Sequence, residues 1–296
     1  MAAHLFAAID VGSFELEMGI YETTSRNGLR EIDHLRHVIS LGRDTYHTGK
    51  ISYHLVDEMC QVLEEFEQVM KSYQVEDYRA YATSAMREAK NSQIILEQIR
   101  VRTGIQVQVI SNSEQRFLGY KAIAMKEAEF QKIIQKGTAI ADVSFGSLQI
   151  SLFDKDSLVS TQNIQQGILR LRENLSGVWS DRQTVLGIFE DMVDNELYAF
   201  KKMYLKDRDI KNLICIGESI LYLARDEVAG KRVDRISAAD FQKFYEKLIQ
   251  MPVDQIEDRF GVNQEYAHLL IPAAIIYKQI LEMTGAEMLW VPGIRM

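Results

Sequence analysis

The chain has 296 residues, of which 47% are apolar, and this is enough for two domains of ordinary size with substantial cores. Its net charge is −8 at pH 7, from 34 basic and 42 acidic residues, so it lacks the overall positive field of a nucleic-acid-binding protein. An anionic ligand would therefore need a local group of arginines and lysines.

The cysteines and the first residues of the chain indicate its compartment. Cys60 and Cys215 are the only cysteines, show no metal-type spacing and are expected to be reduced and buried. The first residues enter a strand-like pattern and lack the basic and apolar regions of a signal peptide. No apolar run reaches the length of a membrane span. We therefore expect a soluble, cytoplasmic protein that contacts neither a membrane nor nucleic acid.

The first half of the chain opens with three strand-like stretches and then alternates helices with strands. Apolar residues recur with the helical period between Leu55 and Met70, which predicts a long amphipathic helix. The polar segment 40–52 is expected to be a loop, and Ser111-Asn112-Ser113 offers good N-caps for the helix that follows it. The expected strands are residues 5–9, 16–21, 30–39, 78–82 and 106–110, and the expected helices begin near residue 53, near residue 93 and after residue 113.

The second half repeats this opening. Its expected strands are residues 138–141, 149–153, 158–164, 213–216 and 288–291, and its expected helices are residues 167–175, 181–205, 238–249, 253–260 and 264–283. A sheet that opens each half and is followed by helices fits an α/β protein with two lobes. The charged segment 126–136 is the expected boundary, which gives domains of residues 1–125 and 126–296.

One turn occurs twice, and it is the most informative feature of the sequence. Asp10-Val11-Gly12-Ser13 and Asp142-Val143-Ser144-Phe145-Gly146-Ser147 each follow an apolar run and lead into an alternating segment. The two aspartates are 132 positions apart (142 − 10), close to half the chain, which predicts two similar lobes facing one cleft. Glycine lets backbone N–H groups approach an anion, and an aspartate can hold a metal ion or a water. A single copy would be an ordinary hairpin turn, but two copies indicate a site for phosphates or nucleotides.

The segment after the expected strand 78–82 points to a family. Residues 82–91 read Ala-Thr-Ser-Ala-Met-Arg-Glu-Ala-Lys-Asn, which is similar to the Ala-Thr-Ser-Ala-x-Arg-Glu-Ala-x-Asn segment of the exopolyphosphatase / guanosine pentaphosphate phosphohydrolase (Ppx/GppA) family. Further similarities lie at Leu41-Gly42 with Thr48-Gly49 and at residues 167–171. The resemblance covers most of residues 5–175, and the family is a branch of the actin–Hsp70–sugar-kinase superfamily.

The resemblance implies two ribonuclease-H-like (actin-like ATPase) lobes with the substrate between them. It also implies hydrolysis of a terminal phosphoanhydride in inorganic polyphosphate or guanosine pentaphosphate, assisted by Mg²⁺ or Mn²⁺, with a glutamate activating the water. Carried over to this sequence, the phosphate-binding residues are Gly12, Ser13, Arg87, Gly146 and Ser147, and the metal-binding residues are Asp10 and Asp142. Arg87 could instead pair with Glu88 or another acid, and the two aspartates could simply cap their turns.

The position of the catalytic base depends on the alignment. The family pattern is roughly Ser-Gly-x-Glu-Glu-Ala-Arg, and its last glutamate is the base, whereas this chain reads Ser111-Asn112-Ser113-Glu114-Gln115-Arg116. If one residue is deleted, Glu114 takes the base position, which we favour. With no gap the position falls on Gln115, which is no useful proton acceptor.

Both phosphate turns depart from the family pattern. Phe14 and Glu15 replace small polar residues, and Ser144 and Phe145 replace glycines, so a carboxylate or a ring could interfere with a phosphate. These changes favour an alternative, a non-catalytic or weakly active paralogue that binds polyphosphate or a nucleotide. An actin-like ATPase or sugar kinase is disfavoured because Gly217-Glu218-Ser219 replaces a Gly-Gly-Thr-like turn. The apolar segment 269–281 suits either a homodimer interface or a core.

Overall fold

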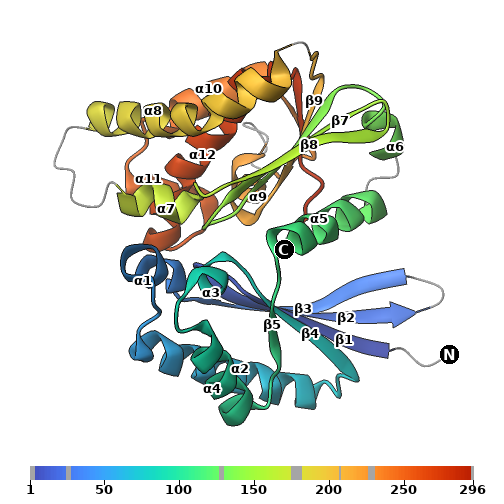
Figure 1. Cartoon of the computed structure of the whole chain (residues 1–296), viewed down its shortest axis with the longest axis vertical. Coiled ribbons are helices and arrows are strands. Elements are labelled where there is room, and N and C mark those ends of the chain that lie inside the picture. The colour runs from blue at the N-terminus through green and yellow to red at the C-terminus, as the bar shows by residue number, and fades with distance from the viewer. Residues whose placement is uncertain are drawn as a thin grey trace. The chain divides into compact units, whose positions relative to one another are not determined.

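The computed structural model describes residues 4–24, 28–126, 130–174, 182–206, 208–225 and 231–294. Contacts divide the chain into two compact units, Met1–Gln115 and Arg116–Met296. Each unit is built on its own mixed sheet with helices packed on it (Figure 1). The expected boundary after residue 125 lies at the end of helix α5 (Asn112–Lys126), the helix within which the two units divide.

The described part of the first unit contains a five-stranded sheet in the order β3-β2-β1-β4-β5. Strands β1, β2 and β3 are antiparallel neighbours, whereas β4 and β5 run parallel to β1. The strands are β1 (His4–Val11), β2 (Glu15–Thr24), β3 (Gly28–Val38), β4 (Asp77–Ala82) and β5 (Val107–Val109). The helices are α1 (Leu41–Thr48), α2 (Tyr53–Ser72), α3 (Ser84–Glu88) and α4 (Ser92–Thr103).

Helices α2 and α4 lie together against the first sheet (Figure 1). The apolar stripe of α2 supplies Met59 and Leu63, which belong to the same core as Met18 and Ile20 of β2. Cys60 is fully buried in this core as a free thiol, and Cys215 is buried in the second unit, so the expectation for both cysteines is confirmed. Burial of this stripe explains why its helical period was readable from the sequence.

The described part of the second unit contains a six-stranded sheet in the order β10-β11-β9-β6-β7-β8. The strands are β6 (Thr138–Val143), β7 (Leu148–Asp154), β8 (Ser157–Ile164), β9 (Asn212–Ile216), β10 (Arg235–Ser237) and β11 (Met288–Trp290). The helices are α6 (Phe130–Ile133), α7 (Ile168–Asn174), α8 (Arg182–Phe200), α9 (Glu218–Leu223), α10 (Ala238–Leu248), α11 (Val253–Phe260) and α12 (Gln264–Thr284), and a π-helical turn η1 (Lys201–Leu205) continues α8.

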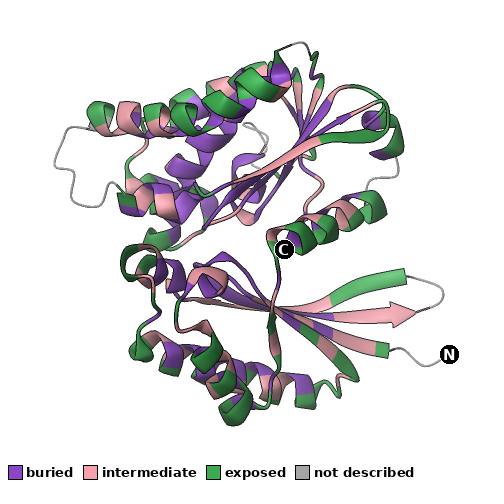
Figure 2. Cartoon of the chain, viewed as in Figure 1, coloured by how far each residue is buried: buried purple, intermediate pink, exposed green. Residues whose placement is uncertain are grey.

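Helix α12 is the core helix of the second unit. It contacts α7, α8, α9, α10, α11 and strand β6, and it is buried along most of its length (Figure 2). Residues 269–281 therefore have a place in the core of one chain, and their apolar character needs no second copy.

The two units share one framework, and the predicted duplication is confirmed. In each, three antiparallel strands lead into a helix, and the first strand pairs in parallel with a later one: β1 with β4 and β6 with β9. The two turns also have the same size, because Gly12 N–H donates to Glu15 O and Ser144 N–H donates to Ser147 O, each at 3.0 Å. The offset of 132 residues therefore holds from Asp10 to Glu15. This is the predicted α/β fold class of actin-like ATPases.

Several local expectations were wrong. Residues 41–48 form helix α1 rather than a loop; the helix is short and polar, and of the three residues that it buries, Leu41, Gly42 and Thr45, only Leu41 is strongly apolar, so there was little signal for it in the sequence. The sequence analysis also missed the short elements α3, α6, α9 and β10, and the end of the helix expected at 181–205 is π-helical. Residues 175 and 181, where two helix ends were expected, lie outside the described residues.

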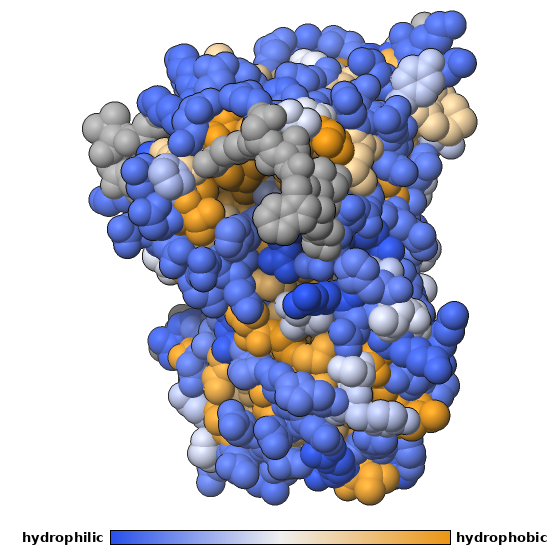
Figure 3. All heavy atoms as spheres, turned by 90° about the vertical axis from the view of Figure 1, so that its left-hand side faces the viewer, coloured by the Kyte–Doolittle hydropathy of each residue, from blue (hydrophilic) through white to orange (hydrophobic). Residues whose placement is uncertain are grey.

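Among the described helices, none is long and apolar enough to cross a membrane. The face of the molecule in Figure 3 is mainly hydrophilic, with smaller apolar patches between the polar side chains. Scattered apolar surface of this kind is ordinary for a folded protein.

Candidate functional site

The first turn connects β1 to β2. Asp10 lies half-buried near the end of β1 and is paired across the sheet with Glu17. Gly12 closes the turn, and a Cβ added to it would lie 2.8 Å from the carbonyl oxygen of Glu15. A side chain at position 12 would therefore displace backbone, which explains the glycine.

A cluster of three hydroxyl groups holds the first turn to two helices. Ser13 Oγ lies 2.8 Å from Tyr46 Oη of α1 and 2.8 Å from Ser84 Oγ of α3, and these two partners are 3.2 Å apart. Ser13 and Ser84 are each only 3% exposed. The expected phosphate ligand Ser13 therefore braces the turn within its own unit. The role of Tyr46 had no signal in the sequence, because it is 33 positions from Ser13.

Arg87 of α3 is half-buried and fixed at one end. Its Nη1 donates a 2.7 Å hydrogen bond to the carbonyl oxygen of Ile110. Burial lowers the pKa of the guanidinium, but an arginine remains charged at neutral pH. The remaining N–H donors of Arg87 can therefore bind an anion, while the nearby charge of Glu88 raises the pKa of the guanidinium.

The two replacements in the first turn do not crowd it. Phe14 is fully buried. Glu15 is 7% exposed at its side chain and pairs with Arg36 of β3, with 2.5 Å between Nε and Oε2. The same guanidinium lies 3.5 Å from Glu17, so one arginine neutralises two buried acids. The charge of Glu15 is therefore balanced within the first unit.

The second turn connects β6 to β7 and is docked against helix α7. Asp142 is 6% exposed and accepts a 3.1 Å hydrogen bond from Ser144 Oγ. The first N–H groups of α7, from Ile168 and Leu169, donate to the carbonyl oxygens of Ser144 and Phe145 at 3.1 and 2.8 Å. These N–H groups are therefore used within the protein.

Glycine is required beneath this turn rather than in it. A Cβ added to Gly167 would collide with the backbone of Phe145, Gly146 and Ser147. Ser144 and Phe145 are not among the described non-glycine residues with positive φ, so the glycines that they replace were not needed for a left-handed backbone. The half-buried Phe145 ring packs edge-on against Tyr266 at 6.0 Å between centroids, and buried Ser147 closes the turn.

A row of polar side chains crosses the second sheet at Asp142. Gln149 of β7 pairs opposite Asp142, and Asn163 of β8 pairs opposite Gln149. Gln149 is 2% exposed, and neither its Nε2 nor its Oε1 has a hydrogen-bond partner among the described residues; the same holds for Asn163 Oδ1. Buried polar atoms rarely lack a partner unless water or a ligand supplies one. The sequence analysis missed this row, although the size of the turn fixes residue 149 opposite residue 142.

Glu114 and Gln115 have different environments at the start of α5. The exposed Glu114 forms a capping box with Ser111: its Oε2 accepts from Ser111 N–H at 2.8 Å, and its own N–H donates to Ser111 Oγ at 3.2 Å. The hydrogen bond from the Ser111 backbone lowers the pKa of Glu114. Gln115 is 2% exposed, and its Oε1 has no partner among the described residues.

The carboxylates suit a hydrated cation rather than a preformed metal centre. Within the described residues, no group of three or more His, Cys, Asp or Glu side chains could hold a metal ion. Mg²⁺ often keeps several waters and is bound through one or two carboxylates and the substrate phosphates. Single carboxylates such as Asp10 and Asp142 fit that mode of binding.

Two matching sheets, each with an aspartate at the end of its first strand and a tight turn after it, define an α/β protein with the actin-like ATPase fold. Comparison with family models then gives the family. The model of the Ppx/GppA phosphatase family matches residues 20–291, and the chain belongs to this family.

The individual relatives have low sequence identity to this chain, but the similarity extends over nearly its whole length. Exopolyphosphatase 1 of Mycobacterium tuberculosis is 22% identical over 286 residues, which is 94% of this chain and 82% of that protein. A Ppx/GppA family member of Aquifex aeolicus has a similar crystal structure, with a TM-score of 0.75, 22% identity and coverage of 98% of this chain and 94% of that one. An exopolyphosphatase structure from Cytophaga hutchinsonii gives a TM-score of 0.79 at 18% identity, covering 97% and 93%.

Proposed function

We propose that this protein hydrolyses the terminal phosphoanhydride bond of inorganic polyphosphate by attack of water in the presence of a divalent cation. The observation that carries the proposal is the match to a phosphatase family over residues 20–291. Phosphoryl transfer asks a protein mainly to position the reactants and to neutralise charge, which Arg87 and the two turns are suited to do.

Each predicted site residue has a role in this proposal. Arg87 binds a phosphate with the donors that its bond to Ile110 leaves available. Gly12, Ser13, Gly146 and Ser147 shape the turns that face the phosphate chain. Asp10 and Asp142 hold Mg²⁺ or Mn²⁺, which when bound would neutralise phosphate charge.

Glu114 is the proposed base, and it has a second task at the start of α5. Its carboxylate caps the helix through Ser111, so it would have to leave that hydrogen bond to accept a proton from water. A glutamine at position 114 keeps the cap, because Gln also serves at this position of a capping box. Glu114→Gln therefore removes the base with little change to the helix.

Polyphosphate is the first substrate to test, because two of the similar proteins described above are named as exopolyphosphatases. Guanosine pentaphosphate has the same terminal phosphoanhydride and belongs in the same assay.

We also infer that the protein works in the cytoplasm, where its buried thiols would stay reduced. A homodimer is a further prediction, which light scattering of the purified protein would test.

A second candidate function is binding without turnover. It is favoured by the chemistry of Gln115 and Gln149, which are both 2% exposed amides next to the proposed base and metal residues. An amide donates hydrogen bonds to phosphate oxygens but cannot take a proton from water at neutral pH. If no carboxylate serves as base, the same residues would make a polyphosphate-binding protein.

Release of phosphate from long-chain polyphosphate with Mg²⁺ decides between these functions. We expect the parent protein to be active, Glu114→Gln to lose at least about a hundredfold in rate and Gln115→Ala to keep most of its rate. The matched control is Glu97→Gln, which changes an exposed glutamate on α4 that is paired with Arg100. If the folded parent releases no phosphate from either substrate with Mg²⁺ or Mn²⁺ but binds polyphosphate, the second function is correct.

A further inference from the structure

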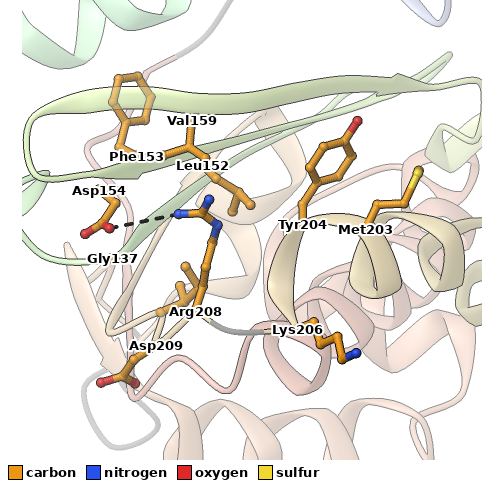
Figure 4. Close-up of a pocket in the computed structure, with 11 residues that line it drawn as sticks. Gly137, Leu152, Phe153, Asp154, Val159, Met203, Tyr204, Lys206, Arg208 and Asp209 are labelled. Carbon is orange, nitrogen blue, oxygen red and sulfur yellow. Dashed lines mark ion pairs between the residues drawn. The ribbon is translucent and has the colours of Figure 1, made fainter.

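A cavity of about 380 Å³ lies in the second unit, outside the candidate site. It is bounded by the β7–β8 hairpin on one side and by the π-helical turn η1 with Lys206 and residues 208–210 on the other (Figure 4). The residues that matter for its chemistry are Leu152, Asp154, Val159, Met203, Tyr204 and Arg208.

This cavity is separate from the turn at Asp142. Gly137, which also lines it, directly precedes strand β6, whereas Asp142 lies near the other end of that strand. Five residues of extended chain span about 16 Å. A ligand in the cavity would therefore not touch the polar row at Asp142.

The π-helical turn creates one wall of the cavity. Helix α8 ends at Phe200 and continues as η1, which places the Tyr204 ring 5.2 Å from the Phe200 ring, between centroids. Met203 in the same turn is 60% exposed. Short π-helical segments inside or at the end of α-helices are frequent at functional sites, because they re-aim side chains that a regular helix would place elsewhere.

Arg208 is the charged group of the cavity. Its only side-chain partner among the described residues is Asp154, and the atoms Nη1 and Oδ2 are 3.9 Å apart, too far for a hydrogen bond. Figure 4 shows the guanidinium pointing toward the β7–β8 hairpin, on the same side as Tyr204 and Met203, whereas Lys206 and Asp209 point away. Asp209 is paired with Lys211 at 3.2 Å, and the same cation lies 3.3 Å from Glu287.

The wall of the cavity formed by Leu152 and Val159 is apolar, and the cavity has a further polar group in the Tyr204 hydroxyl. Leu152 is 1% exposed and Val159 is 37% exposed, and both face the cavity from the hairpin. The Tyr204 hydroxyl has no hydrogen-bond partner among the described residues. A thioether and a phenol ring are favourable partners for a flat aromatic ring, and a guanidinium fork is a favourable partner for a phosphate. Apolar walls with a few convergent polar groups are the usual composition of small-molecule sites.

We propose that this cavity is a second ligand site, which binds a small molecule composed of a planar heteroaromatic ring and a phosphate, the composition of a nucleoside monophosphate. The ring lies against Tyr204 and Met203, and the phosphate takes hydrogen bonds from Arg208 in place of its distant ion pair with Asp154. The proposal does not depend on the hydrolase function, because no residue of the cavity belongs to either turn.

The test is calorimetric titration of the full chain with AMP and with GMP, without metal. We expect Arg208→Ala to weaken binding at least about tenfold, Arg208→Lys to weaken it less, and Tyr204→Leu to weaken it several-fold, because ring stacking and the bidentate fork are lost separately. Ribose 5-phosphate, which lacks the ring, and adenosine, which lacks the phosphate, should each bind more weakly than AMP.

Two control variants make the outcome unambiguous. Lys243→Ala removes an exposed cation of α10 that is paired with Asp240 and does not line the cavity, and Arg87→Ala removes the cation of the candidate phosphate site. Both should leave AMP binding unchanged. The proposal is overturned if neither nucleotide binds at millimolar concentration, if Arg87→Ala abolishes binding while Arg208→Ala does not, or if ribose 5-phosphate binds as well as AMP.

Discussion

The two units carry the same turn on the same framework, but the polar rows beside the turns differ in charge. In the first unit the row is Asp10, Glu17 and Arg36, whereas at the corresponding places in the second unit it is Asp142, Gln149 and Asn163. The first row carries its own cation, which also neutralises Glu15. The second row offers one carboxylate and two amides, and atoms of both amides are buried without a hydrogen-bond partner among the described residues.

The two rows differ in how their charge is balanced. Arg36 supplies a cation to the first row, although Glu17 Oε1, 3.5 Å from Arg36 Nε, also lacks a hydrogen bond among the described residues. In the second row, both amide atoms of Gln149 and Asn163 Oδ1 have no hydrogen-bond partner within the described part of the chain, so water or a ligand can satisfy them. The uncharged amides of the second row are therefore the better place to look for contacts with phosphate.

The largest effect expected from this comparison is that of removing Arg36. Arg36→Ala leaves Glu15 and Glu17 buried without their cation, which should lower the free energy of unfolding by about 3 kcal/mol. Urea denaturation at pH 7 measures it. The matched control is Arg30→Ala on the same strand, whose exposed pair with Glu22 should contribute less than about 0.5 kcal/mol. Equal effects for both arginines would mean that the first row is not held by Arg36.

The variant Gly167→Ala tests how the start of helix α7 supports the second turn. Gly167→Ala pushes a Cβ into the backbone of the turn at Phe145 and Ser147, which should cost about 2 kcal/mol in the free energy of unfolding. The control is Gly187→Ala in α8, where an added Cβ meets nothing within 4 Å and should stabilise the helix by up to about 1 kcal/mol. Thermal denaturation of both variants gives the sign, and a neutral Gly167→Ala would show that α7 can shift.

The hydroxyl cluster tests whether Ser13 braces the first turn. Ser13→Ala and Ser84→Ala should each cost about 1 kcal/mol, and the double variant should cost clearly less than the sum, because the two hydroxyls bond to each other. Denaturant titrations of the four proteins complete the cycle. Additive losses would mean that Ser13 and Ser84 act independently and that Ser13 is available to a ligand.

Gln149 allows the two rows to be compared directly. Gln149→Leu removes two buried atoms without partners, so the stability of the free protein should stay the same or rise by up to about 1 kcal/mol, while polyphosphate binding weakens about fivefold. Glu17→Leu at the corresponding place in the first unit should instead destabilise, because Arg36 loses an acid. Denaturation measures the stability of the two variants, and a titration with polyphosphate measures the binding of Gln149→Leu. A clear loss of stability in Gln149→Leu would assign its amide a structural role.

Patterns that repeat along the sequence predicted the turns, the strands beside them and the long helix. They did not predict which side chains contact each other in the fold. The two turns, their flanking strands and the long helix at residues 53–72 follow from alternation, helical period and the offset of 132 residues. The partners of Ser13 and Glu15 depend on strand register and on contacts between positions 21 to 71 residues apart, which no local pattern encodes. For the same reason, the sequence could identify Asp142 but not the amides aligned with it.

The smallest effect concerns Glu114 and its helix cap. Hydrogen bonds from Ser111 lower the pKa of Glu114 in the folded protein below its ordinary value of 4.5. Its contribution to stability is therefore fully present above pH 4.5 and is lost as the pH falls through the lower folded-state pKa. Glu114→Ala should be less stable than the parent at pH 7, and the gap should narrow below pH 4.5. Ser111→Ala removes the hydroxyl that accepts from Glu114 N–H but keeps the backbone N–H that donates to the Glu114 carboxylate, so adding Glu114→Ala to it should still lower stability at pH 7. A gap that stays constant with pH would mean that the Glu114 charge does not cap α5, which would leave its carboxylate available to act on water.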